Sequence, residues 1–129
     1  MWVFYPHFVD HLVFRVAQFD RTEHFYTTLL GEPLREDDYL MYVAGDTRLF
    51  FTLSPASNQG DYDKEKIGLN HIALGVRTVA ELNTIVAQLD DSGIVHSGIK
   101  VWQDGVTQYI WLNDPDGIRV EIWLRPVEP

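Results

Sequence analysis

Apolar residues recur along the chain in short runs that alternate with polar positions, the pattern of half-buried β-strands. We expect strands at residues 9–16, 39–44, 48–53, 69–76, 94–101, 107–112 and 118–124. The last strand follows an Asn-Asp-Pro-Asp-Gly sequence at 113–117. Proline fixes φ, aspartate bonds its own backbone and glycine accepts positive φ, so this stretch favours a tight turn.

Two stretches show helical periodicity instead, with one apolar face each. We expect the first helix to start at an Asp20 N-cap with Glu23 as its capping-box partner, and to end at Gly31. The second is expected to start at a capping box of Thr78 and Glu81. The apolar faces consist of Phe25, Tyr26, Leu29 and Leu30 in the first helix and Val79, Leu82, Ile85, Val86 and Leu89 in the second.

The same succession of elements occurs twice. A strand with a histidine near its start, His11 or His71, is followed by a helix and then by further strands. This indicates an internal duplication within a single domain of residues 1–129, with module one at 9–54, a polar linker at 55–67 and module two at 68–125. Neither module alone buries much core. We therefore expect an α+β fold whose paired sheets curve around a shared cup.

Composition narrows the class of protein. With 46% hydrophobic and 22% charged residues, the chain is typical of globular domains. It has no apolar run of transmembrane length and no signal-peptide pattern, so we expect a cytoplasmic protein without a membrane partner. The net charge of −9 argues against a nucleic-acid partner, because phosphate backbones bind basic patches. Cysteine is absent, so any metal must be bound by histidine and carboxylate.

Three residues form a candidate metal site. Glu121 lies within the last strand, and by strand alternation it shares a face with Arg119 and Trp123. If a pseudo-twofold axis relates the modules, the strands of His11 and His71 lie side by side and both imidazoles converge on Glu121. Two imidazoles and one carboxylate form a facial triad suited to divalent Fe, Mn, Ni or Zn. A single strand histidine is more often structural, but its recurrence in both modules favours the metal.

Other residues are placed near this site by the same alternation. His96 is read either as an acid or base close to the metal or as an edge histidine. Tyr109 is read either as a donor to a developing oxyanion or as a cap on the cup. Arg119 either pairs with an acidic ligand or with Glu121, or lies exposed at the rim. The cup is expected to be lined by Phe51, Trp111, Arg119 and Trp123.

Together these residues resemble the vicinal oxygen chelate superfamily of glyoxalases, bleomycin-resistance proteins and extradiol dioxygenases. The resemblance runs from Asp10 to Leu124 and is carried by His11, Glu23-His-Phe-Tyr-Thr-Thr-Leu-Leu-Gly31, Asn70-His71 and Asp114-Pro-Asp-Gly117 with Glu121. It implies two βαβββ modules forming a curved mixed sheet around the cup. It also implies a divalent metal bound by His11, His71 and Glu121, and a homodimer. The aromatic residues 1–8 are expected to form a short edge segment or a dimer contact.

The members of the superfamily differ at identifiable positions. Glyoxalase I has a carboxylate ligand on the last strand of its first module, where alignment places Phe51. Extradiol dioxygenases have a tyrosine ten residues before the final glutamate, where this chain has Trp111. Fosfomycin-type thiol transferases need only the three ligands and cationic groups, for which Lys100, Arg119 and Arg125 are candidates.

Two functions follow as expectations. The first is a metalloenzyme of the vicinal oxygen chelate type, acting as a lyase or isomerase, thiol transferase or dioxygenase. Its metal would be a Lewis acid toward a small substrate with neighbouring oxygens. The alternative is a non-catalytic protein that binds an aromatic small molecule or antibiotic in the cup, as bleomycin-resistance proteins do.

Overall fold

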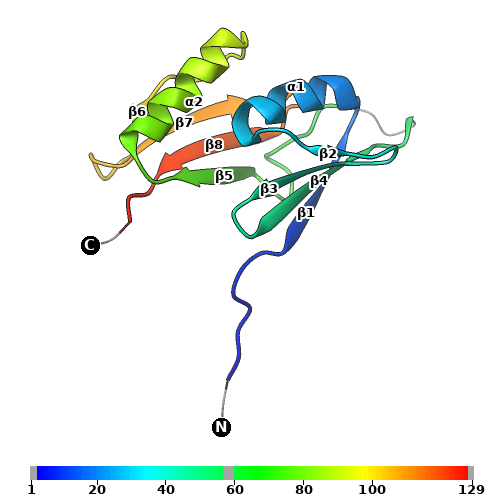
Figure 1. Cartoon of the computed structure of the whole chain (residues 1–129), viewed down its shortest axis with the longest axis horizontal. Helices are drawn as coiled ribbons and strands as arrows, with labels where there is room; N and C mark the ends of the chain where they lie inside the picture. Colours follow the sequence, from blue (N-terminus) through cyan, green and yellow to red (C-terminus); the bar gives the residue numbers. More distant parts are fainter. Residues whose placement is uncertain (1–2, 57–59, 128–129) are drawn as a thin grey trace. The chain divides into compact units, whose positions relative to one another are not determined.

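The computed structural model describes residues 3–56 and 60–127, and the chain divides into two compact units, Met1–Gln59 and Gly60–Pro129. Each unit contains one helix and one four-stranded mixed sheet (Figure 1). The internal duplication predicted from the sequence is therefore confirmed, and the units are taken in turn. Residues 57–59 of the expected linker lie outside the described residues.

The first unit contains β1 (His11–Val16), α1 (Phe19–Leu30), β2 (Leu34–Arg35), β3 (Leu40–Ala44) and β4 (Thr47–Leu53). Its sheet has the strand order β1-β4-β3-β2, with β1 parallel to β4 and the other pairs antiparallel. Three of these strands match the sequence predictions, whereas β2 was not predicted because two residues are too few to show a period.

The second unit contains β5 (His71–Val76), α2 (Val79–Asp91), β6 (Lys100–Val101), β7 (Gln108–Asn113) and β8 (Arg119–Leu124). Its strand order is β5-β8-β7-β6, again with one parallel pair, β5 and β8. The strand predicted at 94–101 is shortened to its last two residues. Gly98 has a φ of 73°, which breaks the extended backbone just before β6.

Each helix packs against its own sheet (Figure 1). In the second unit the fully buried side chains are Leu82, Leu89, Ile110, Leu112, Val120 and Ile122. In the first unit the buried aromatic side chains are Phe14, Phe25, Tyr26, Tyr42 and Phe51. Among the described residues no helix is both long and apolar enough to cross a bilayer.

The prediction that Phe51 lines a cup is wrong, because Phe51 lies in the core of the first unit. Its exposed fraction is 0%, its ring stacks on Phe14 at 5.0 Å between centroids, and it lies 4.3 Å from the ring of Tyr26. The strand registers explain the error. Phe50 pairs with Val13 in the first unit as Glu121 pairs with Ala73 in the second, so Phe50 is the counterpart of Glu121. Phe51 points to the opposite face of β4.

The two helix starts behave differently. Thr78 and Glu81 form the predicted capping box, with Glu81 N–H donating to Thr78 Oγ1 at 3.1 Å and Thr78 N–H donating to Glu81 Oε1 at 2.9 Å. The capping box predicted at Asp20 is wrong, since α1 begins at Phe19 with Gln18 as an N-cap that makes no side-chain bond. Gly31 ends α1 as expected, with a φ of 81°.

The predicted turn before β8 is confirmed. Asp114 Oδ1 accepts the N–H groups of Asp116 at 2.8 Å and Ile118 at 2.9 Å, and Gly117 has a φ of 86°. The Asp116 carbonyl accepts the N–H of Tyr62 at 2.9 Å, so this turn also fixes the loop that leads into β5. The start of β8 is therefore held firmly relative to the start of β5.

Candidate functional site

One face of the second sheet carries most of the predicted site residues. The other face packs on α2, and alternation places every second residue of β5, β7 and β8, including these, on the face opposite α2. Glu121 pairs with Ala73 of β5 on one side and with Trp111 of β7 on the other, while Trp123 pairs with Tyr109. His71 opens β5 in register with Arg119 on the same face. The strand alternation read from the sequence therefore holds for these three strands.

Glu121 lies at the centre of this face. It is only 4% exposed, and three groups surround its carboxylate. Arg119 Nε donates to Oε2 at 2.8 Å and Trp123 Nε1 donates to Oε1 at 2.7 Å. The third group is His71, whose Nε2 lies 3.6 Å from Oε1. Of the readings considered for Arg119, the structure shows the pair with Glu121.

The orientation of His71 is set by its neighbour. Its Nδ1 lies 2.8 Å from Asn70 Oδ1, and Asn70 Nδ2 donates to the Lys64 carbonyl at 2.9 Å. Because Asn70 uses its amide nitrogen on that carbonyl, its oxygen is an acceptor, and Nδ1 of His71 carries the hydrogen. The lone pair of neutral His71 is then on Nε2, the nitrogen nearest Glu121.

Aromatic rings and arginines surround the carboxylate. The Arg119 guanidinium lies over the Trp111 ring at 4.7 Å from its centroid. Tyr109 stacks on Trp123 with centroids 4.7 Å apart and planes at 14°. The structure also brings Arg125 to 4.9 Å and Trp102 to 5.9 Å from the Trp123 ring. Trp102 was missed by sequence reasoning because it follows the two-residue strand β6, where no alternation signals a face.

His96 has a different environment. Its Nδ1 accepts the N–H of Gly98 at 3.0 Å, and its Nε2 lies 2.7 Å from Asp90 Oδ1 at the end of α2. Both ring nitrogens are therefore engaged by groups of the second unit, Asp90 and Gly98. It borders a small open hollow of about 170 Å³ lined by Val95, His96, Ser97, Trp111, Leu112 and Asn113.

His11 belongs to the first unit. Its Nδ1 lies 2.8 Å from Asp10 Oδ2, and its ring meets the Phe50 ring edge-on at 5.7 Å between centroids. Asp10 thus orients His11 much as Asn70 orients His71. In both imidazoles Nδ1 is engaged by the preceding residue, and Nε2 is the nitrogen that could bind a metal. The position equivalent to Glu121 is Phe50, so the first unit provides a histidine but no carboxylate at this point.

His71 and Glu121 fit a divalent metal ion as two of its ligands. Two atoms bonded to one ion at zinc-like distances lie about 3.0 to 3.5 Å apart. The observed separation of 3.6 Å needs only a small side-chain adjustment. A hydrogen bond from the remote ring nitrogen to an acceptor is also usual for a histidine ligand. Within the described residues no group of three or more His, Cys, Asp or Glu side chains forms a metal site, so this pair is a partial donor set.

Comparison with known sequences identifies the family. The sequence profile of the Glyoxalase/Bleomycin resistance protein/Dioxygenase superfamily matches residues 8–122. The chain belongs to this superfamily. The profile thus spans both βαβββ modules, including His11, His71 and Glu121.

Individual relatives are consistent with that membership. A probable lactoylglutathione lyase of Vibrio cholerae is 30% identical over 126 residues, which covers 90% of this chain and 89% of the relative. A glyoxalase/bleomycin resistance/dioxygenase domain from Frankia has a TM-score of 0.77 at 19% identity, covering 93% of this chain and 98% of its own. A lactoylglutathione lyase from Agrobacterium tumefaciens has a TM-score of 0.70 at 18% identity, covering 92% and 94%. The two structures establish the shared fold.

Proposed function

We propose that this protein is a metal-dependent enzyme of the vicinal oxygen chelate type. His71 and Glu121 would hold a divalent ion of Fe, Mn, Ni or Zn, with His11 as the third ligand. The observation that carries the proposal is the 3.6 Å approach of His71 Nε2 to Glu121 Oε1, with the other ring nitrogen bound to Asn70. The part of His11 rests on its equivalent place in the sequence repeat.

The bound ion would supply Lewis acidity toward a small substrate with neighbouring oxygens. The chain itself supplies the surroundings. Arg119 donates its Nε–H to Glu121, and its other guanidinium nitrogens would attract an anionic oxygen of the substrate. The Trp111 ring under that guanidinium provides a flat apolar wall. Tyr109, stacked on Trp123, is the proposed hydroxyl donor to an oxyanion.

Two observations, one on a relative and one on the first unit, support a reaction class. The name of the 30% identical Vibrio cholerae relative supports a lyase acting on a glutathione adduct. In the first unit the position equivalent to Glu121 is Phe50, which neither binds a metal nor accepts a proton. We therefore propose lyase or isomerase chemistry with three protein ligands, and with proton transfer that does not use a carboxylate at position 50.

A binding protein is the second candidate, and one observation favours it. Arg119 and Trp123 already satisfy both oxygens of Glu121, so the buried carboxylate is stable without a metal. The ring cluster of Tyr109, Trp111 and Trp123 would then hold an aromatic ligand.

Metal analysis of the purified protein distinguishes the two. We expect one divalent ion per chain when the protein is prepared without oxygen, which retains Fe(II). The ion should be lost in His71→Ala and in Glu121→Gln, and the circular dichroism of both variants should match that of the wild type. His24→Ala, on the exposed side of α1, is the matched histidine control and should retain the ion. Turnover of a glutathione hemithioacetal by the loaded protein supports the lyase, whereas oxygen uptake supports a dioxygenase. A metal-free protein whose tryptophan fluorescence is quenched by an aromatic ligand refutes the enzyme.

A further inference from the structure

The carboxylate of Glu121 is fixed by two residues of its own strand, and these residues differ in charge. Arg119 holds Oε2 and Trp123 holds Oε1. We propose that Trp123 is a positioning residue whose indole N–H keeps Oε1 of Glu121 turned toward His71, ready to bind the metal. This inference rests on the proposed function and assigns to Trp123 a role other than that of a cup wall.

The indole is suited to this role because it only donates. Trp Nε1–H has no lone pair to offer a metal, so it cannot replace Glu121 as a ligand. A carboxylate oxygen has two acceptor positions. Oε1 can therefore accept the indole N–H at 2.7 Å and still present a lone pair toward Nε2 of His71 at 3.6 Å.

The neighbours of Trp123 keep the donor in place. Tyr109 stacks on its ring, and the Arg125 guanidinium lies 4.9 Å from its centroid. A large ring with contacts of this kind has few alternative rotamers. The direction of the N–H bond is thus set by the packing of the ring.

Removing the indole N–H of Trp123 should allow Arg119 to form a second hydrogen bond to the Glu121 carboxylate, a rearrangement that we call capture. An arginine forms two parallel hydrogen bonds to a carboxylate where geometry allows, and this is its strongest arrangement. In the structure Arg119 reaches Glu121 through Nε at 2.8 Å, while Trp123 occupies the second oxygen. Without the indole, rotation of Glu121 toward a two-bond pair would withdraw Oε1 from His71. The expected result is weaker metal binding without unfolding.

Trp123→Phe tests this, because it retains a stacked ring and removes the donor. We expect its affinity for Zn²⁺, measured by competition with a chromogenic chelator, to fall by about 10- to 100-fold, the usual effect of losing a group that orients a ligand. The visible spectrum of the Co²⁺-loaded protein should change as well. Trp102→Phe is the matched control, because Trp102 touches the same ring without bonding Glu121, and its affinity should be unchanged.

A double variant tests the capture mechanism. If Arg119 withdraws Oε1, Trp123→Phe combined with Arg119→Met should bind Zn²⁺ more tightly than Trp123→Phe alone. Equal weakening in the two variants would exclude capture and leave only loss of a donor, contrary to the mechanism proposed. Wild-type protein that binds no metal would refute the proposed function. Wild-type protein that binds metal, together with unchanged affinity in a folded Trp123→Phe, would refute only the role of Trp123.

The metal-free wild-type protein offers a readout that needs no variant of Trp123. One indole N–H proton should resonate downfield and exchange slowly, and Glu121→Gln should move that signal, because an amide is a weaker acceptor than a carboxylate. If all indole protons exchange rapidly and none responds to Glu121→Gln, Trp123 does not hold Glu121 and the inference fails.

Discussion

At the scale of single residues, each module has a histidine whose ring is oriented by the residue before it. Asp10 accepts from His11 and Asn70 accepts from His71, both at 2.8 Å to Nδ1. The side chains differ in charge but have the same acceptor geometry. An acceptor on Nδ1 leaves Nε2 as the basic nitrogen, which is the protonation state that a metal ligand requires. The sequence contains this signal as Asp10-His11 and Asn70-His71.

Asn70→Ala should change the tautomer of His71 before any metal is added. Without the amide oxygen, nothing selects the Nδ1–H form, and the ring should move toward the Nε2–H form that predominates in free imidazole side chains. ¹⁵N NMR of the histidine ring nitrogens measures this directly. Asn83→Ala, on the exposed face of α2, is the control and should leave the spectrum unchanged. Identical His71 nitrogen shifts in the wild type and in Asn70→Ala would contradict the assigned role of Asn70.

Tyr42 shows a second local effect, in the core of the first unit. Its hydroxyl lies 2.8 Å from Thr27 Oγ1 and donates to the Glu23 carbonyl at 3.3 Å. Burial raises the pKa of Tyr42 to about 12, from its ordinary value of 10.0. The neutral phenol is thus favoured in the folded state. Its contribution to stability is complete below pH 10 and is lost as the pH rises toward 12.

Tyr42→Phe should isolate the contribution of the Tyr42 hydroxyl to the stability of the protein. At pH 7 we expect the free energy of unfolding of the variant to be lower than that of the wild type by about 1 kcal/mol, the usual net value of a hydrogen bond. Above pH 10, where the wild type loses the contribution of Tyr42, the stability difference between the two proteins should narrow. Urea unfolding between pH 7 and pH 11.5 measures both. A difference that stays constant across this range would show that Tyr42 ionises equally in the folded and unfolded states.

At the scale of elements, the two helix starts show how far local sequence goes. Thr78 and Glu81 cap α2 through bonds to each other and to the N–H of neighbouring Arg77. Asp20 and Glu23 have the same spacing as a capping box, but Arg35 of β2 pairs with both, at 3.2 Å and 3.1 Å. These hydrogen bonds also raise the pKa of Arg35, and the bond to Asp20 has the larger effect. The competing partner lies twelve or more residues away, so local spacing did not reveal it.

Strand faces were predicted correctly where the pairing of strands has no bulge. The register runs residue by residue through the strands that carry His71, Tyr109, Trp111, Arg119, Glu121 and Trp123. Phe51 was placed on the wrong face because adjacent Phe50 and Phe51 give the same apolar signal, and a shift of one residue reverses the face of a strand. Only the pairing of β1 with β4 determines which phenylalanine corresponds to Glu121.

Thr78→Ala tests the cap of α2. Loss of the side-chain bond to the Glu81 N–H should destabilise the protein at pH 7 by about 1 kcal/mol. The N–H of Arg77, followed by the Thr78 hydroxyl, lowers the pKa of Glu81, so its ionised form contributes stability above its ordinary pKa that is lost as the pH falls through the lower folded value. Without the hydroxyl this loss is smaller, so the variant and wild type should converge toward pH 3.

Urea unfolding at pH 7 and pH 3 gives the comparison for Thr78→Ala. Thr84→Ala is the matched control, because Thr84 lies exposed in the middle of α2 and alanine has the higher helix propensity. It should be neutral or slightly stabilising at both pH values. Equal effects of the two substitutions would mean that the hydroxyl of Thr78 contributes no more to the stability of α2 than that of an exposed threonine in mid-helix, which would contradict the role of the cap.

At the scale of the whole molecule, the repeat predicted the architecture because it is encoded twice. Two histidine strands, two helices and two sets of following strands predict the duplication, and the family resemblance implies the βαβββ modules that the structure has. A repeat shows which residues are equivalent, such as His11 and His71. It carries no distance between residues of different modules, because that distance depends on packing between side chains that the repeat does not pair. The site was therefore predictable within the second unit and remains a proposal for His11.

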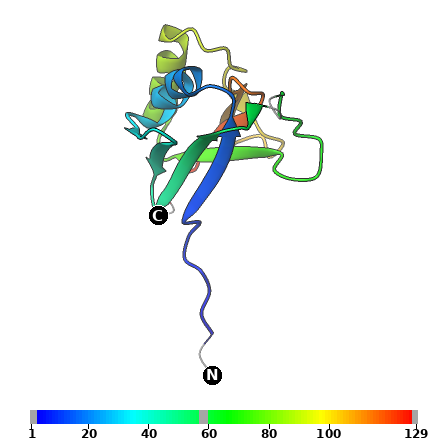
Figure 2. The same cartoon turned by 90° about the vertical axis from the view of Figure 1, so that its right-hand side faces the viewer.

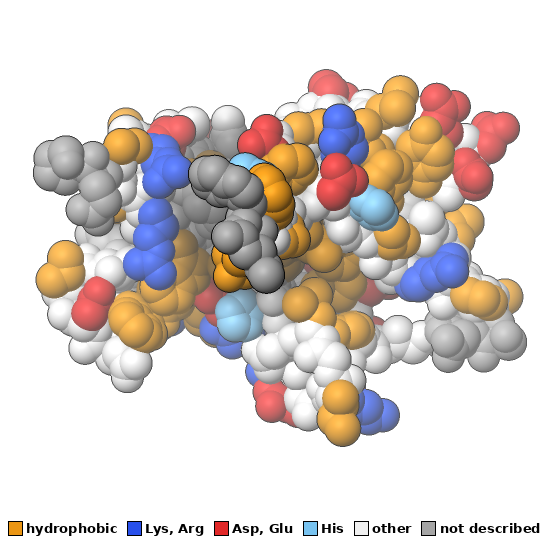
Figure 3. Space-filling model, turned by 90° about the horizontal axis from the view of Figure 1, so that it is seen from below, with side chains coloured by type: hydrophobic (Ala, Val, Ile, Leu, Met, Phe, Trp, Pro, Cys, Tyr) orange, Lys and Arg blue, Asp and Glu red, His pale blue; other side chains and the backbone are white. Residues whose placement is uncertain are grey.

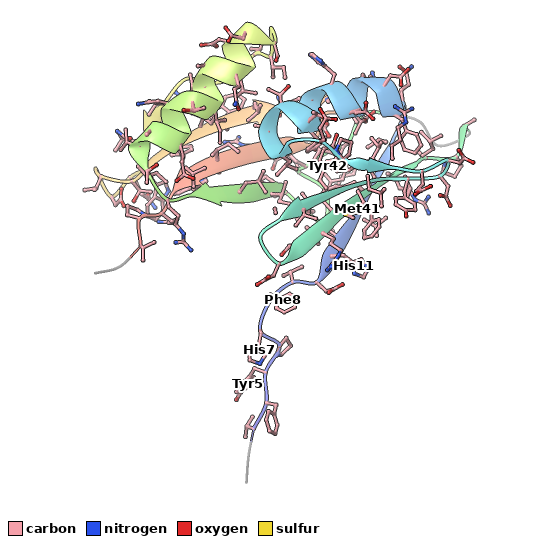
Figure 4. All side chains as sticks on the ribbon, viewed as in Figure 1. Tyr5, His7, Phe8, His11, Met41 and Tyr42 are labelled. Atoms are coloured by element: carbon pink, nitrogen blue, oxygen red, sulfur yellow. The ribbon has the colours of Figure 1, made fainter. Side chains whose placement is uncertain are left out.

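The amino-terminal segment bears on the homodimer that the family resemblance implies. Residues 3–10 run away from β1 as an extended segment without helix or strand (Figure 2). Its apolar side chains are each more than half exposed, namely Val3, Phe4, Tyr5, Phe8 and Val9. Tyr5, His7 and Phe8 project from this segment in Figure 4, and hydrophobic side chains also reach the surface in several places in Figure 3. We propose that a second copy of the chain covers this segment, because exposed aromatic clusters of this kind usually mark an interface.

Replacing the aromatic residues of the segment should therefore weaken self-association. Burying one phenylalanine contributes about 1.5 to 3 kcal/mol, so the loss of two should raise the dimer dissociation constant by at least two orders of magnitude. Phe4→Ser with Phe8→Ser tests this by sedimentation velocity over a range of protein concentrations, and His7→Ser, within the same segment, is the control. A wild type that is monomeric throughout would refute the homodimer. A double variant that dimerises as tightly as the wild type would place the interface elsewhere, because the residues that lose apolar area on substitution would then contribute nothing to association.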